Sequence, residues 1–136
     1  IWYPADALRA LPDDRLSFLL FPVARPELLD AVVADERGWV REIQVKQANA
    51  ESNWIWGAFK MPGRTLRELH DLWQERNRAD EYIGTLVNAW LARGGSAWSA
   101  RAGASYFDVG TMDGYLEAMR MLSEPEREAA ASRSAE

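Results

Sequence analysis

Residues 17–21 read Ser-Phe-Leu-Leu-Phe, an apolar run that Pro22 stops. Its length and aromatic content are typical of a strand that is buried on both faces, in a sheet covered by helices. Residues 31–34 (Ala-Val-Val-Ala) predict a second strand. The polar run 35–38 predicts a tight turn, and residues 39–46 then return as the hairpin partner. We therefore expect a sheet built outward from the first of these strands.

The rest of the chain mixes strand-like and helical segments. Thr65 followed by Glu68 forms a capping box at the start of one helix, and Asp80 is a candidate cap for the next. Strands and helices mix throughout, so the predicted class is α/β. The predicted elements are a short helix at 5–11, a strand at 53–61, helices starting near 65 and 82, strands at 96–101 and 105–107, and a helix at 112–122. In the last helix we expect four apolar residues to face the core: Tyr115, Leu116, Met119 and Leu122. Residues 123–136 have nothing to bury and predict a polar tail, frayed or helical.

Composition excludes several classes of function. The chain has 136 residues and a net charge of −5, which leaves no surplus of cations to neutralise nucleic acid. It contains no cysteine and a single histidine, His70, so a disulfide framework and a zinc site built on thiolates or on two histidines are both excluded. His70 itself is predicted to be a solvated helix residue. No apolar run approaches the roughly 20 residues that span a membrane, and we expect a cytoplasmic protein.

The segment 107–111 carries the clearest candidate for chemistry. Asp108 ends a predicted strand, and Gly110 and Thr111 lead into a helix. A carboxylate there is the hard oxygen ligand that Mg²⁺ prefers, and a glycine lets a ligand approach the backbone. The same pattern also fits a carboxylate that binds turn amides and a threonine that caps the helix. The residues alone leave both readings open.

Two further candidates lie earlier in the chain. Lys46 ends a polar strand face just before an irregular loop, where an ammonium can hold a phosphate; a surface lysine is the plainer explanation. Trp54 and Trp56 precede Gly57, and tryptophan faces stack on sugar rings, although most tryptophans pack in cores.

The order of these segments resembles the sugar-nucleotide nucleotidyltransferases, the relatives of glucose-1-phosphate thymidylyltransferase and mannose-1-phosphate guanylyltransferase. The likeness covers nearly all of residues 15–122, and we expect residues 1–122 to form the C-terminal, sugar-phosphate and metal side of such a domain. The resemblance rests on Phe-Pro-Val (21–23), Arg-Pro-Glu (25–27), Val-Val-Ala-Asp-Glu-Arg-Gly (32–38), Ile-Gln-Val-Lys (43–46), Ser-Asn-Trp-Ile-Trp-Gly (52–57) and Phe-Asp-Val-Gly-Thr-Met-Asp-Gly-Tyr-Leu-Glu-Ala (107–118).

The resemblance implies a mixed, mostly parallel, Rossmann-like sheet flanked by helices, and an enzyme that joins a sugar 1-phosphate to a nucleoside triphosphate and releases pyrophosphate. It implies that Asp108 is a ligand of Mg²⁺ and that Lys46 contacts the sugar phosphate. It also implies a sugar pocket, whose candidate residues are Trp54, Trp56, Gly57, Glu81 and Gly110.

Three departures from the family pattern fall on the sugar side. The family's acid before the lysine, which holds a sugar hydroxyl, is Val45; a family glycine is Asp30; and the final acid of the stretch 81–86 is Leu86. These departures keep a non-catalytic nucleotide-sugar-binding or regulatory homologue open as an alternative. A structural or oligomerisation half, with tryptophans at a subunit interface, is a third, and a homo-oligomer stays open in each case. The family's glycine-rich phosphate loop would precede Ile1, so we expect a longer enzyme.

Overall fold

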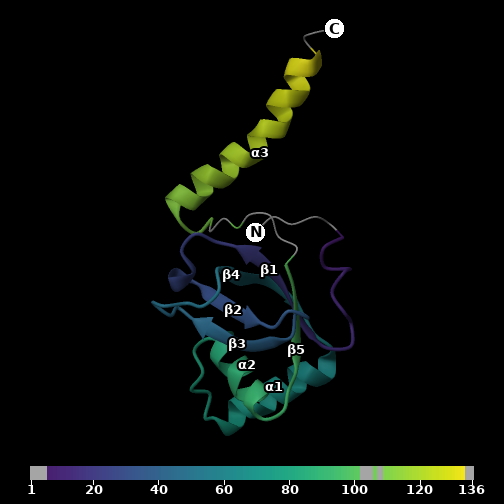
Figure 1. Ribbon diagram of the computed structural model, residues 1–136, viewed down its shortest axis with the longest axis vertical. Coiled ribbons are helices and arrows are strands. Elements are labelled where there is room, and N and C mark those ends of the chain that lie inside the picture. The colour runs from purple at the N-terminus through teal and green to yellow at the C-terminus, as the bar shows by residue number, and fades with distance from the viewer. Residues whose placement is uncertain (1–5, 102–105, 107–108, 134–136) are drawn as a thin grey trace. The chain divides into compact units, whose positions relative to one another are not determined.

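The computed structural model describes residues 6–101, 106 and 109–133 (Figure 1). The chain divides into two compact units: residues 3–105, and residues 106–136 together with residues 1–2. The larger unit holds a five-stranded sheet in the order β3-β2-β4-β1-β5. Its strands are β1 (Leu16–Pro22), β2 (Asp30–Ala34), β3 (Val40–Val45), β4 (Trp54–Lys60) and β5 (Ala97–Arg101).

The expectation of a mostly parallel sheet is wrong. Among the described strands only β1 and β5 pair in parallel, whereas β1–β4, β2–β3 and β2–β4 are antiparallel. The reason lies in the connections: a tight turn joins β2 to β3, and such a turn can only produce an antiparallel pair. The helices α1 (Gly63–Glu75) and α2 (Ile83–Ala92) lie between β4 and β5 in the sequence, and this long connection allows β5 to pair in parallel with β1. The expected α/β class with a mixed sheet flanked by helices is confirmed.

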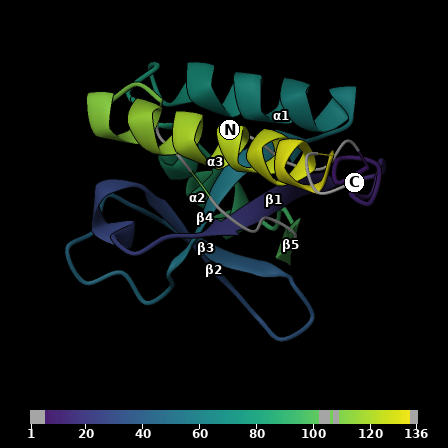
Figure 2. The same ribbon diagram turned by 90° about the horizontal axis from the view of Figure 1, so that it is seen from above.

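The strand predictions from apolar runs are confirmed, and β1 is buried along its length as its composition indicated. Phe18 and Leu20 form one core with Leu69 of α1 and Val87 of α2. Figures 1 and 2 show α1 and α2 together against the sheet. The helical and 3-10 elements are η1 (Pro26–Leu28), α1 (Gly63–Glu75), α2 (Ile83–Ala92) and α3 (Met112–Arg133).

Both predicted helix caps are wrong. α1 begins two residues early, with Pro62 at its N-cap and Thr65 buried in the first turn. The N-cap of α2 is Tyr82, because Asp80 is engaged by a two-point ion pair with Arg76, at 2.7 and 2.9 Å.

Differences also appear at the two ends of the chain. Residues 6–10 form a turn rather than the expected short helix, and the strand expected at 105–107 lies largely outside the described residues. The tail is helical as far as Arg133, one of the two forms expected for it, because α3 continues past residue 122. Tyr115, Leu116 and Met119 are about half exposed rather than buried as predicted. Within the described part of the chain, no helix combines the length and the apolar character that crossing a membrane requires.

The tip of the β2–β3 hairpin bends back to β5. The amide of Ser99 donates to Gly38 O (2.8 Å), and the Trp98 indole donates to Arg37 O (2.9 Å). Gly38 has φ +86°, as the turn prediction requires, and a Cβ there would lie 2.6 Å from Ser99 O. Only glycine therefore fits at this contact.

Helix α2 lies unusually close to the edge strand β3. Asn88 accepts a hydrogen bond from Ile43 N (2.8 Å) and donates one to Ile43 O (2.7 Å). One turn earlier, a Cβ on Gly84 would lie 2.7 Å from Val45 Cγ2 and 2.9 Å from Ile43 Cγ2. The start of α2 is therefore held against the end of β3.

Because α2 lies so close to β3, we expect Gly84→Ala to change the free energy of unfolding in the opposite direction to most helix glycine-to-alanine substitutions. Replacing a helix glycine by alanine commonly stabilises by about 0.5–1 kcal/mol, but here overpacking should lower the free energy of unfolding by about 1–3 kcal/mol. Denaturant unfolding measures the difference. Gly63→Ala is the matched control, since its Cβ would meet only Arg67 Nη1 at 3.7 Å. A stabilised Gly84→Ala variant would show that the contact is not tight.

Candidate functional site

Lys46 lies at the end of β3 with its backbone in the left-handed region, at φ +47°. Its amide donates to Leu29 O (3.0 Å). Its ammonium donates to Tyr82 Oη (3.2 Å) and lies 4.5 Å from the centre of the Tyr82 ring. A non-glycine residue with positive φ is uncommon and often marks a position fixed for function. The Lys46 ammonium is therefore positioned both by the end of β3 and by Tyr82, the N-cap of α2.

The charge of Lys46 is stabilised by its surroundings. The hydrogen bond with Tyr82 raises the pKa of the Lys46 ammonium, and the negative charges of Asp30 and Glu81 raise it further. Lys46 is exposed, so its cation is available to an anionic ligand in solvent.

Asp30, the first residue of β2, is paired with Val45 and so lies beside the strand end that carries Lys46. The start of α2 covers it closely, since a Cβ on Gly84 would lie 3.4 Å from Asp30 Oδ2. Burial raises the pKa of the Asp30 carboxyl, whereas the Trp56 indole N–H and the Lys46 charge oppose the shift. The carboxyl is therefore partly desolvated next to a cation.

The ring and the indole nitrogen of Trp56 lie in different environments. Its ring packs in the core, 6.2 Å from the Phe18 ring and 5.6 Å from the Phe59 ring. Its indole nitrogen is buried and makes no hydrogen bond of ordinary geometry within the described part of the chain, but it interacts with the Asp30 carboxyl and lowers its pKa. The ring is thus a core group, and the N–H belongs to the surroundings of Asp30.

Trp54 has a separate environment. The guanidinium of Arg101 stands 5.1 Å from the centre of its ring, and both residues line a pocket of about 270 Å³ together with Arg41 and Glu51. Gly57 lies at a bulge in β4, because Leu19 pairs with Ala58 and Leu20 with Trp56.

The structure therefore brings Asp30 and the Trp56 N–H together beside Lys46 and the start of α2, and Glu81 lies close enough for its charge to act on Lys46. Gly110 lies in an exposed turn of the unit that contains residues 106–136. Asp108 falls outside the described residues. In the described ranges, no three side chains of His, Asp or Glu lie close enough to hold a metal ion.

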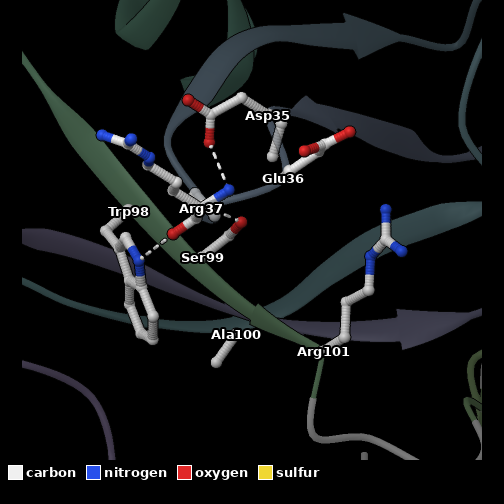
Figure 3. A pocket seen from close by; sticks show the side chains of 9 residues that line it. Asp35, Glu36, Arg37, Trp98, Ser99, Ala100 and Arg101 are labelled. Carbon is white, nitrogen blue, oxygen red and sulfur yellow. Dashed lines mark hydrogen bonds between the residues drawn. The ribbon is translucent and has the colours of Figure 1, made fainter.

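A separate cleft of about 420 Å³ lies between the hairpin tip and β5 (Figure 3). Asp35, at the top of Figure 3, accepts hydrogen bonds from the amides of Arg37 (2.9 Å) and Trp39 (2.8 Å), so it serves the turn. Arg101 stands at the other end of the cleft. The lining contains none of the residues that the sequence analysis selected.

Sequence reasoning missed Tyr82 and did not recognise what Asp30 does. Tyr82 has the spacing of an apolar, core-facing residue of the second predicted helix, whereas its hydroxyl contacts Lys46, 36 positions earlier. Asp30 stood out only as a departure from the family pattern. The sequence did contain a signal for Asp30. It directly precedes the predicted strand 31–34, which forms a hairpin with the predicted strand that ends at Lys46.

Comparison with known proteins supports the fold. No family model matches the chain, and no curated protein matches it. A solved structure of a Bacillus anthracis protein, provisionally assigned as a glucose-1-phosphate thymidylyltransferase and crystallised with sucrose, matches with a TM-score of 0.67 and 20% identity. The match covers 82% of this chain and 44% of that one, so this chain spans less than half its length. The chain therefore has a nucleotidyltransferase-like fold.

The position of Asp30 predicts that Asp30→Asn stabilises the fold at neutral pH. A carboxyl whose folded pKa is raised binds protons more tightly in the folded chain, so stability falls as pH rises from about 4 through that folded pKa. The Asp30→Asn variant has no ionisable group at this position, so it does not lose stability in this way as pH rises. Its advantage in thermal unfolding over the native chain should therefore be small near pH 4 and larger at pH 7. The exposed Glu36→Gln serves as control. A variant less stable than the native chain at pH 7 would contradict the assignment.

Proposed function

We propose that this chain is the acceptor-side part of a sugar-1-phosphate nucleotidyltransferase, which joins a sugar 1-phosphate to a nucleoside triphosphate to give a nucleoside-diphosphate sugar and pyrophosphate. The observation that carries the proposal is the exposed Lys46 cation, fixed by a left-handed backbone and by Tyr82 beside α2, in a chain with a nucleotidyltransferase-like fold.

In this proposal Lys46 binds the phosphate of the acceptor as a point charge. Glu81, whose charge acts on Lys46, and Trp56, whose N–H is buried, are proposed to contact the sugar together with Gly57 at the bulge of β4. Trp54 and Gly110 are proposed to line the wider sugar pocket. The neighbour's complex with sucrose supports sugar binding by proteins of this fold.

The proposed reaction is an in-line displacement. An oxygen of the acceptor phosphate attacks the α-phosphorus of the triphosphate, and the bond to the pyrophosphate leaving group breaks. Asp108 is proposed as one oxygen ligand of Mg²⁺, which would offset phosphate charge when bound. The triphosphate-binding residues are proposed to come from a segment outside this chain, as do those that read the base.

One set of observations favours a second candidate, a homologue that binds a nucleotide sugar without turnover. Val45, Asp30 and Leu86 depart from the family pattern on the acceptor side.

Calorimetry and a pyrophosphate assay with Mg²⁺ separate the two candidates. An enzyme releases pyrophosphate from some pair of triphosphate and hexose 1-phosphate, and Asp108→Asn abolishes that release while the fold stays intact. A regulator binds and shows no release.

Lys46→Ala tests whether Lys46 binds the phosphate of the acceptor. Losing a charge-assisted contact of about 1.5–3 kcal/mol should weaken sugar 1-phosphate binding about 10- to 100-fold, with a much smaller effect on triphosphate binding. Titration calorimetry measures both affinities.

Lys60→Ala is the matched control, because Lys60 is the only other lysine and is engaged with Asp13 and the carbonyl of Leu11. Unchanged sugar phosphate binding in Lys46→Ala, or an equal loss in Lys60→Ala, would refute the role of Lys46.

A further inference from the structure

Helix α3 exposes its apolar side. Met112, Tyr115, Leu116 and Met119 recur at steps of three and four residues, so they form one stripe along the first turns of the helix. We call these four residues the α3 stripe. Their exposed fractions are 73%, 49%, 45% and 49%, respectively. A surface helix normally turns such a stripe toward a partner and leaves its polar side to solvent.

The half-buried positions of this part of α3 lie elsewhere on the helix. Within residues 112–121 they are Gly114, Ala118 and Met121, and none of them belongs to the α3 stripe. The helix thus exposes its apolar side more than these other positions. An exposed, contiguous group of large apolar side chains commonly marks an interaction surface.

Opposite charges flank the α3 stripe. Asp113 and Arg120 are seven residues apart, close to two helical turns, so they lie on the same flank, one near each end of the stripe. Both side chains are exposed, and neither takes part in an ion pair within the described residues. A matching partner would present an apolar stripe with the two charges in reverse order.

A second copy of α3 presents this pattern when it runs antiparallel to the first. A two-fold axis near Leu116 places Asp113 of each copy opposite Arg120 of the other. The same axis stacks the two apolar stripes, because the midpoint between Met112 and Met119 also lies within one residue of Leu116. A parallel pair would instead place like charges opposite each other, which is unfavourable.

We propose that this chain forms a homodimer through the α3 stripes of two antiparallel copies, with an Asp113–Arg120 ion pair at each end of the contact. The inference is independent of the proposed function, because α3 starts after all the residues proposed to bind the acceptor. Four apolar side chains from each copy make a small interface, so the dimer belongs to the weakly associating class.

Sedimentation equilibrium over protein concentrations up to the millimolar range measures the association. The native chain should dimerise, and Met119→Lys should weaken the dimer by about 10-fold or more, because it buries a charge in the apolar contact. Leu66→Lys is the matched control: Leu66 is an exposed apolar residue of α1, at 59%, and lies outside α3. It should leave the association unchanged.

A charge exchange tests the ion pairs. Arg120→Asp places two acids opposite each other at both ends of the contact and should weaken the dimer about 10-fold. The double variant Asp113→Arg/Arg120→Asp reverses both charges, so the pairs form again and the native association should return. Circular dichroism of each variant checks that α3 stays helical.

Single-cysteine variants test the direction of the helices, since the chain contains no cysteine. Leu116→Cys lies near the two-fold axis and should give a disulfide-linked dimer on mild oxidation. Met112→Cys should not, because its two copies would be eight or nine residues apart along the helices. At about 1.5 Å per residue this separation is about 12–13 Å, beyond the roughly 7 Å that a disulfide spans between Cα atoms.

Several results would overturn the inference. One is a native chain that stays monomeric, and another is a dimer that Leu66→Lys weakens and Met119→Lys does not. Disulfide-linked dimers of both cysteine variants would indicate a parallel pair. A double charge variant that stays as weak as Arg120→Asp would remove the ion pairs. A Met119→Lys variant that loses thermal stability with no change in association would show that the chain itself covers the stripe.

Discussion

The two hydrogen bonds between Asn88 and the backbone of Ile43 hold the candidate site together. β3 is an edge strand, so the outward amide and carbonyl of Ile43 have no neighbouring strand to bind, and one asparagine side chain satisfies both, at 2.8 and 2.7 Å. Because Gly84 has no side chain, α2 can approach β3 closely enough for these bonds to form. The start of α2 is thereby fixed beside the ends of β2 and β3, where Asp30, Lys46 and Tyr82 meet.

Several features near this point work against the stability of the fold. Lys46 has a left-handed backbone, the Asp30 carboxyl is partly desolvated, and the Trp56 indole nitrogen is buried without a hydrogen bond in the described residues. Each is an unfavourable choice for a sequence selected for stability alone. Their concentration around the start of one helix is the pattern expected of a binding site, where a ligand supplies the missing partners.

Much of the sheet could be predicted from local patterns, because apolar runs such as residues 17–21 determine which strands are buried. The predicted helix caps were wrong, since Thr65 is buried inside the first turn of α1 and Asp80 is held by Arg76, four positions earlier. Lys46 was identified from its place at a strand end. The contacts that define its surroundings, from Tyr82 to Lys46 and from Asn88 to Ile43, join residues 36 and 45 positions apart and have no local signature. The bend of the hairpin onto β5, 61 positions away, was missed for the same reason.

The central claim is that Lys46 lies in the acceptor site beside the start of α2, and the indole N–H resonances test it most directly. In a titration with glucose 1-phosphate followed by nuclear magnetic resonance, the Trp56 indole proton should shift, because the Trp56 N–H interacts with Asp30, which lies beside Lys46. The indoles of Trp90 and Trp98 already donate to Glu68 and to Arg37 O, so they serve as internal references that stay in place. A saturating titration in which Trp56 stays fixed while Trp98 moves would contradict the account and direct attention to the hairpin cleft.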